Sequence, residues 1–310
     1  MELSNNTIQK NANPQAPDWA SVALPKTWPD LLDLSSWRGW RELIRAFAGK
    51  QQRAVKLPDT GFTLNAGFKS DAAFTSSTGF RLDAIPKYIL NEFHNLPNGN
   101  YSRRFSRGYI TGFDIAMLGE MQPVRQWIAG HLRACNAVLD VGTAGGRTAA
   151  IIKQQGVEKV WGLDPSPYLL QHAAADYPDI DFIPGLAEDL PFADKRLNGI
   201  AVCFVLHEMP PKYIKKAVAE FYRVLQGGGK LVIAEPSPQQ LQPLQWRSLL
   251  RRRGWSHLYF KLLAGHVYEP FISTWHKLDK PALLAEAGFR LLEDRPGMPI
   301  NCWVAEKPAS

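Results

Sequence analysis

The chain has 310 residues, of which 45% are hydrophobic and 21% charged, so it can build one large core or a domain with an appendage. Its net charge of +7 is scattered apart from one basic cluster at 247–255, and we therefore do not expect a nucleic acid partner. No apolar run approaches about 18 residues, no secretory signal is recognisable, and the 3 cysteines form no CxxC pair, which favours a cytoplasmic protein without a membrane span or a disulfide framework.

The N-terminal third carries no motif. Residues 1–25 are polar and contain prolines, and we expect a disordered lead-in there. Residues 26–95 mix short helical patterns with irregular stretches, and in the clearest of them Leu43, Ile44 and Phe47 recur at helical spacing. We expect 26–95 to be an accessory segment, either a lid or a contact surface of a homodimer.

From residue 96 onward, apolar strands alternate with amphipathic helices. This alternation predicts a parallel sheet with helices on both faces, and ligands of such sheets bind beyond the carboxyl ends of the strands. The expected strands are 137–141, 157–164, 179–185, 199–206 and 229–236, and the expected helices between them are 146–156, 166–178 and 211–225.

The first two strands end in residues typical of nucleotide binding. Gly142 and Gly146 allow a sharp turn and a close approach of the backbone to a ligand. An NAD or FAD fingerprint would need glycines where this chain has Ala144 and Arg147. Asp164, at the end of the second strand, can accept hydrogen bonds from both ribose hydroxyls, or it can cap the next helix.

Five segments, in this order, resemble the motifs of class I S-adenosylmethionine-dependent methyltransferases, most closely the ubiquinone and menaquinone biosynthesis type (methyltransferase type 11): "VLDVGTAGG", "GLDPSPYLL", "GLAEDLPF", "FVLHEMP" and "EFYRVLQGGGKLVIAEP". The resemblance covers about 100–310. It implies a domain at 96–310 with a doubly wound, seven-stranded, mostly parallel, Rossmann-like sheet that closes in a hairpin at 288–308. It also implies S-adenosyl-L-methionine as methyl donor and S-adenosyl-L-homocysteine as product.

The same resemblance implies the cofactor contacts. The glycine loop would pass under the methionine part with Asp140 shaping it, Asp164 would hold the ribose, and Pro165 and Ala187 would contact the adenine. The family often has Asp where this chain has Leu186, so Glu188 or Asp189 would have to bind the adenine amino group. The implied cofactor-binding set is Asp140, Gly142, Thr143, Ala144, Gly146, Asp164, Pro165, Ala187, Glu188 and Phe204.

His207 and Glu208 follow the fourth strand, where the family places residues near the transferred methyl group. A zinc-binding HExxH helix is excluded because Pro211 stands at the second histidine position and the proline pair stops a helix, so we expect no metal. His207, with an ordinary pKa of about 6.5, is our candidate base, and the alternative is that it only shapes the loop. Met209 before the prolines breaks the motif of methyltransferases that act on base amines.

In this family the acceptor pocket is built from the segment before the glycine loop, here 100–121, and an insertion at about 237–280. Both are rich in aromatic residues, which predicts a hydrophobic or aromatic acceptor. The candidate substrate-binding residues are Tyr101, Tyr109, Phe113, Met117, His207, Trp246, Trp255, Tyr268 and Trp275, and His257, His266 and His276 are alternative bases.

The sequence therefore predicts a methyltransferase of small hydrophobic metabolites, of the secondary-metabolism type, with N- or O-methylation favoured. One alternative is a C- or O-methyltransferase of quinones or lipids at a membrane surface, aided by the basic cluster. An alternative of another class is an RNA-modifying or RNA-binding protein on the same fold.

Overall fold

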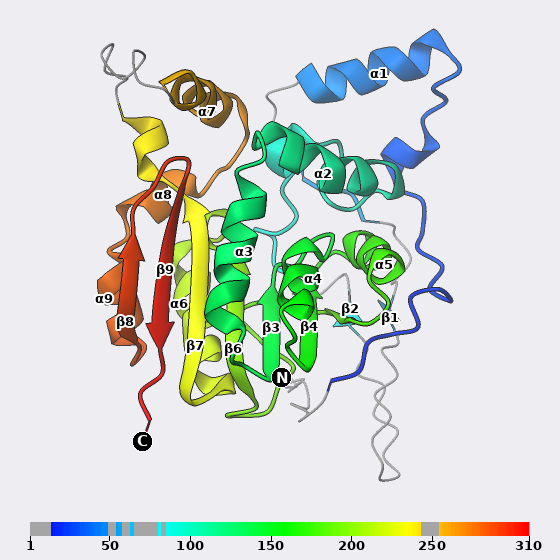
Figure 1. The fold of residues 1–310 in the computed structure, drawn as a ribbon. Helices are drawn as coiled ribbons and strands as arrows, with labels where there is room; N and C mark the ends of the chain where they lie inside the picture. The colour runs from blue at the N-terminus through cyan, green and yellow to red at the C-terminus, as the bar shows by residue number, and fades with distance from the viewer. Residues whose placement is uncertain are drawn as a thin grey trace, which may run out of the picture.

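The structure is a computed structural model that describes residues 14–48, 54–57, 63–64, 80–81, 85–242 and 254–309. Seven strands form one sheet in the order β5-β4-β3-β6-β7-β9-β8 (Figure 1). The first five in this order are parallel, and β9 runs antiparallel to β7 and β8, which confirms the predicted sheet and its closing hairpin. The strands are β3 (Ala137–Val141), β4 (Lys159–Asp164), β5 (Asp181–Pro184), β6 (Leu197–Cys203), β7 (Leu225–Pro236), β8 (Arg290–Arg295) and β9 (Ile300–Glu306). A separate ladder pairs β1 (Thr63–Leu64) with β2 (Phe80–Arg81).

Helices bury both faces of the sheet, which is why its strands read as nearly continuous apolar runs. Successive side chains of a strand point to opposite faces. Leu139 belongs to the core cluster that includes residues of α6 and α9, whereas its neighbour Val138 belongs to the cluster that includes residues of α3, α4 and α5. These helices are α3 (Met121–Leu132), α4 (Arg147–Gln154), α5 (Pro167–Asp176), α6 (Pro211–Val224) and α9 (Lys280–Glu286).

Strand β6 ends at Cys203, three residues before the predicted end. The Glu235 carboxylate accepts the backbone N–H groups of Val205 (2.9 Å) and Leu206 (2.8 Å), so these groups leave the sheet ladder. The chain then turns through the short helix η4 (Leu206–Glu208) before α6 begins at Pro211. The proline pair therefore separates His207 from the helix, as expected.

Residues 14–25 pack against the sheet, which corrects the expected disordered lead-in for this part of the chain. The Trp19 side chain is buried, and its indole N–H donates to the Phe182 carbonyl over 2.8 Å. The Trp161 indole donates to the Pro14 carbonyl over 3.2 Å, and Gln171 donates to the carbonyls of Trp19 and Val22. Proline and polar content indicated disorder, but two tryptophan hydrogen bonds fix the segment.

A set of helices lies beyond the carboxyl ends of the parallel strands, where ligands are expected (Figure 1). Asp30 anchors α2 there, because its carboxylate accepts hydrogen bonds from the Ser102 hydroxyl (2.7 Å) and the Arg104 N–H (2.9 Å). No described helix is long and apolar enough to cross a membrane. The set consists of η1 (Trp28–Leu31), α1 (Trp37–Ala48), η3 (Phe93–Asn95), α2 (Arg103–Ala116), η5 (Pro238–Leu241), α7 (Gly254–His266) and α8 (Ile272–Lys277).

Candidate active site

The loop after β3 is held by Asp140 from below. The carboxylate of this buried aspartate accepts the Thr143 hydroxyl over 2.6 Å and the Ala149 N–H over 3.1 Å. Gly146 has φ +77°, and a Cβ there would lie 2.7 Å from the Phe182 ring, so the position needs glycine. Burial raises the pKa of Asp140 to about 7. Asp140 therefore shapes the loop from within the protein, as the resemblance implied.

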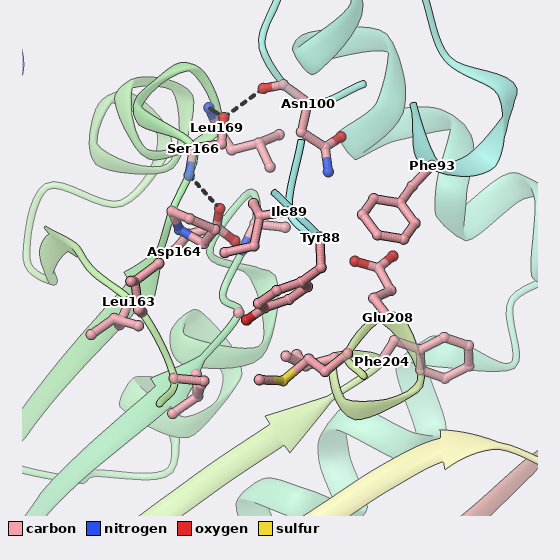
Figure 2. Close-up of a pocket in the computed structure, with 18 of the residues that line it drawn as sticks. Tyr88, Ile89, Phe93, Asn100, Leu163, Asp164, Ser166, Leu169, Phe204 and Glu208 are labelled. Carbon is pink, nitrogen blue, oxygen red and sulfur yellow. Dashed lines mark hydrogen bonds between the residues drawn. The ribbon is translucent and has the colours of Figure 1, made fainter. Parts of the chain in front are cut away.

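Asp164 joins this loop to the end of β4. One carboxylate oxygen accepts the Ala144 N–H and the other the Ser166 N–H, each over 2.9 Å. Figure 2 shows Asp164 on one side of a cavity and Glu208 on the opposite side, with Tyr88 between them. Burial raises the pKa of Asp164 to about 7. A carboxylate offers about four acceptor positions, so each oxygen keeps one for a ligand.

Asp164 lines one of three neighbouring cavities, and Tyr109 and Phe204 line all three. The Asp164 cavity is lined by Tyr88, Ile89, Phe93, Asn100, Tyr101, Gly142, Ala144, Asp164, Pro165, Leu186, Ala187 and Glu208, among others. The Arg125 cavity is lined by Phe113, Arg125, Gly142, Thr143, Ala144, Gly145 and Arg147, among others. The Phe113 cavity, of about 470 Å³, is lined by Phe47, His94, Phe105, Phe113, Met117, Phe260, Leu263 and Glu269, among others.

The Arg125 cavity contains a charged group that sequence reasoning missed. Arg125 is buried, and its guanidinium donates two hydrogen bonds of 2.8 Å to Asp114, which also pairs with Arg147. Burial alone would raise the pKa of Asp114, but these two arginines lower it. The Arg125 Nε–H has no hydrogen-bond partner among the described residues. In the sequence, the only feature that could have indicated this group is that Arg125 lies on the apolar face of the helix α3.

The predicted adenine contacts divide into two groups. Pro165 and Ala187 line the Asp164 cavity, as does Leu186, which stands where the family often has Asp. Glu188 is not one of the lining residues, but its carboxylate accepts the hydroxyl of Tyr88, which lines the cavity, at 2.9 Å. The structure therefore corrects the placement of Glu188 and adds Tyr88, which sequence reasoning missed because it lies 100 residues away.

His207 does not face any of the three cavities. Its side chain is only 1% exposed, and its Nδ1 lies 2.6 Å from the Glu235 carboxylate. Its neighbour Glu208 lines the Asp164 cavity, and burial raises the pKa of Glu208. His207 thus lines none of the three cavities, and its role as a base stays a prediction. The alternative bases His257, His266 and His276 line none of these cavities either.

The predicted acceptor residues are only partly brought together. Tyr109 and Phe113 of α2 and Met117, the residue that follows it, line the Phe113 cavity, because a spacing of four residues places all three on one side of a helix. Tyr101 lines the Asp164 cavity instead. Three candidate residues of the insertion lie away from the cavities. Trp275 is buried against Trp303 with ring centroids 6.0 Å apart, and Trp255 is 73% exposed. Tyr268 lines none of the three cavities. Trp246 lies outside the described residues.

Comparison with known proteins shows what the central segment is similar to. Residues 139–233 match the family model described as a methyltransferase domain, which confirms the predicted resemblance for this segment. An uncharacterized methyltransferase from Synechocystis sp. is 35% identical over 98 residues, which cover 32% of this chain and 46% of that protein. A demethylmenaquinone methyltransferase from Renibacterium salmoninarum is 34% identical over 134 residues (43% and 55%), and one from Chlorobaculum parvum is 37% identical over 99 residues (32% and 40%). The chain thus spans about half the length of the curated relatives it matches.

Proposed function

We propose that this protein transfers a methyl group from S-adenosylmethionine to a small apolar acceptor. One observation carries the proposal. The cavity that holds Asp164 and the glycine loop meets a large apolar cavity at the shared side chains Tyr109 and Phe204. The membership of residues 139–233 in a methyltransferase domain family supports it.

The residues present fit S-adenosylmethionine. The free acceptor positions of Asp164 suit the two ribose hydroxyls, and Pro165 and Leu186 offer apolar contacts for the adenine. The unpartnered Nε–H of Arg125 suits the carboxylate of the methionine part, since buried donors are nearly always satisfied. The cofactor, when bound, supplies a methyl group already activated on a sulfonium.

The protein's own contribution is then alignment and exclusion of water. Well-oriented reactants reach effective molarities of about 10⁵–10⁸ M, so holding an acceptor against Tyr109 and Phe204 provides most of the catalysis. A base is needed only where the acceptor atom loses a proton early. Of the His207–Glu208 pair, only Glu208 lines one of the cavities, and this is the Asp164 cavity, so we place Glu208 next to the cofactor and assign the role of base to neither residue.

The apolar lining of the Phe113 cavity suits a hydrophobic or aromatic acceptor. Small metabolites methylated at N or O remain our first hypothesis. Quinones are the second, because two of the relatives cited above are named demethylmenaquinone methyltransferases. The accessory segment contributes Phe47, Tyr88 and Phe93 to the cavities, which supports a lid role for it.

Calorimetric titration with S-adenosylmethionine tests the cofactor half of the proposal. Asp164→Ala should abolish measurable binding, whereas Asp179→Ala, which changes an exposed aspartate, should bind like the wild type. Absence of binding by the wild type, or unchanged binding by Asp164→Ala, would overturn it.

Incubation with labelled S-adenosylmethionine and either a quinone panel or a host metabolite extract, followed by mass spectrometry, then identifies the acceptor. Label incorporated into RNA instead, with binding that weakens steeply as salt rises, would favour the nucleic acid alternative.

A further inference from the structure

Two histidines and a carboxylate converge between the Asp164 and Phe113 cavities. His94, His207 and Glu269, called the His94 cluster below, each offer one ligand atom, and these atoms lie within 4.8 Å of one another. Glu269 Oε1 is 3.6 Å from His94 Nε2 and 3.7 Å from His207 Nε2. A direct hydrogen bond is shorter than these two contacts. They are instead close to the edge of a tetrahedron around a zinc ion, which is about 3.3–3.5 Å for metal–ligand bonds of about 2.0–2.1 Å.

The hydrogen bond from His207 Nδ1 to Glu235 determines what the other ring nitrogen, Nε2, can do. Nδ1 lies 2.6 Å from the Glu235 carboxylate, and this carboxylate is fully buried and also accepts backbone N–H groups, so the histidine nitrogen is the donor. In the neutral form of His207 the lone pair of Nε2 points into the cluster; without a metal ion, burial alone would lower the pKa of this histidine, but the carboxylates of Glu235 and Glu269 raise it well above its ordinary value. Nε2 is buried and has no hydrogen-bond partner among the described residues. A carboxylate that fixes one imidazole nitrogen while the other faces outward is the usual support of a metal-ligating histidine.

The other two members are held in place from separate segments. His94 stacks on Tyr109 with ring centroids 5.4 Å apart. The backbone N–H of His94 donates to the Tyr268 carbonyl over 3.1 Å. This hydrogen bond holds the loop that carries Glu269 next to η3. Glu208 Oε1 lies 3.3 Å from His94 Nε2 and provides a further carboxylate beside the cluster.

We propose that His94, His207 and Glu269 bind a divalent first-row transition metal ion, with zinc as the best match and Glu235 as the residue that orients His207. Imidazole ligands favour such metals over Mg²⁺ and Ca²⁺, which prefer oxygen ligands. Our expectation of no metal rested on short sequence patterns, above all HExxH. The His94 cluster escapes that pattern, because its members lie 113 and 62 residues apart (94 to 207 and 207 to 269).

The position of the cluster indicates what the ion would contact. His94 and Glu269 line the Phe113 cavity, so the remaining coordination position faces the apolar cavity. Three protein ligands with one open position are typical of catalytic rather than structural zinc. A metal there would bind and polarise an oxygen of the acceptor, and this role, unlike the binding itself, rests on the proposed function.

Metal content tests the site directly. The full chain, purified without a histidine tag, is stripped with a chelator, dialysed against Zn²⁺ and then against metal-free buffer, and the retained zinc is measured by mass spectrometry. We expect about one ion per chain in the wild type. His94→Ala and Glu269→Gln should lose it, and Glu235→Gln should bind zinc about 10–100-fold more weakly. The control is His131→Ala, which removes a histidine 3.5 Å from Glu293, outside the cluster, and should retain zinc.

Thermal unfolding provides a readout that does not depend on activity. Added Zn²⁺ should raise the Tm of the wild type and of His131→Ala, but not that of Glu269→Gln. Circular dichroism of the metal-free variants establishes that they fold. A wild type that retains no zinc and shows no shift in Tm, or folded His94→Ala and Glu269→Gln variants that retain as much zinc as the wild type, would overturn the proposal. Calorimetric titration of the metal-free protein with S-adenosylmethionine keeps this result separate from failure of the proposed function.

Discussion

Replacing Gly146 by alanine tests the description of the glycine loop. This residue precedes α4 with φ +77°, a conformation that costs residues other than glycine about 1–2 kcal/mol. The added Cβ would also lie 2.7 Å from Cζ and 2.9 Å from Cε1 of the buried Phe182 ring. Because a ring in a packed core has little room to move, overpacking adds about 1–3 kcal/mol. Gly146→Ala should therefore lower the free energy of unfolding by about 2–5 kcal/mol.

Gly156→Ala is the matched control. Gly156 has φ +90°, but an added Cβ there would meet no atom within 4 Å. It should therefore cost only the backbone part, about 1–2 kcal/mol. Urea unfolding of both variants, compared at equal m-values, measures the difference. If Gly146→Ala costs no more than Gly156→Ala, the Phe182 ring moves freely and packing does not restrict position 146. If the ring does restrict it, Phe182→Leu in the Gly146→Ala background should cost less than the sum of the single changes.

Three further predictions concern the N-terminal segment, the cofactor and the acceptor. Trp19→Phe removes the donor to the Phe182 carbonyl and should lower the free energy of unfolding by about 1–3 kcal/mol in urea titrations; no change would mean that the hydrogen bond is immaterial. Affinity for S-adenosylmethionine should fall as the pH falls through about 7, measured by calorimetry, because protonation of Asp164 removes an acceptor for the ribose hydroxyls. Since the folded pKa of Asp164 is raised from 3.8, its contribution to stability is complete below pH 3.8 and is lost as the pH rises toward 7. Leu263→Ala, in the Phe113 cavity, should lower kcat/KM for an apolar acceptor by about tenfold with unchanged cofactor affinity, whereas the exposed neighbour Leu262 can be changed to alanine without effect.

The parts of the fold that follow from local patterns could be predicted from the sequence. Strands such as 137–141 are buried on both faces and therefore appear as uninterrupted apolar runs. Asp164 could be predicted as a site residue because it ends such a strand. Tyr109 and Phe113 could be predicted to share a cavity because a spacing of four residues places them on one side of a helix.

Long-range pairing decided what the sequence could not show. The direction of the His207 side chain depends on Glu235, 28 residues further along the chain, and on Glu269. The composition of residues 14–25 indicated disorder, and nothing nearby in the sequence reveals that Trp19 reaches a carbonyl 163 residues away. Trp275 illustrates the opposite case, since an aromatic residue in the expected insertion serves the core instead of the pocket.

The packing of residues 14–25 also bears on how the sheet avoids pairing with other sheets. Strand β5 is one of its two edges, and an uncovered edge is a template for a strand from another molecule. The Trp19 indole N–H donates a hydrogen bond to the Phe182 carbonyl on this edge, so residues 14–25 cover the strand. The opposite edge, β8, is protected differently, since 4 of its 6 residues are charged. Loss of the N-terminal segment would thus expose only the β5 edge, and association of chains would begin there.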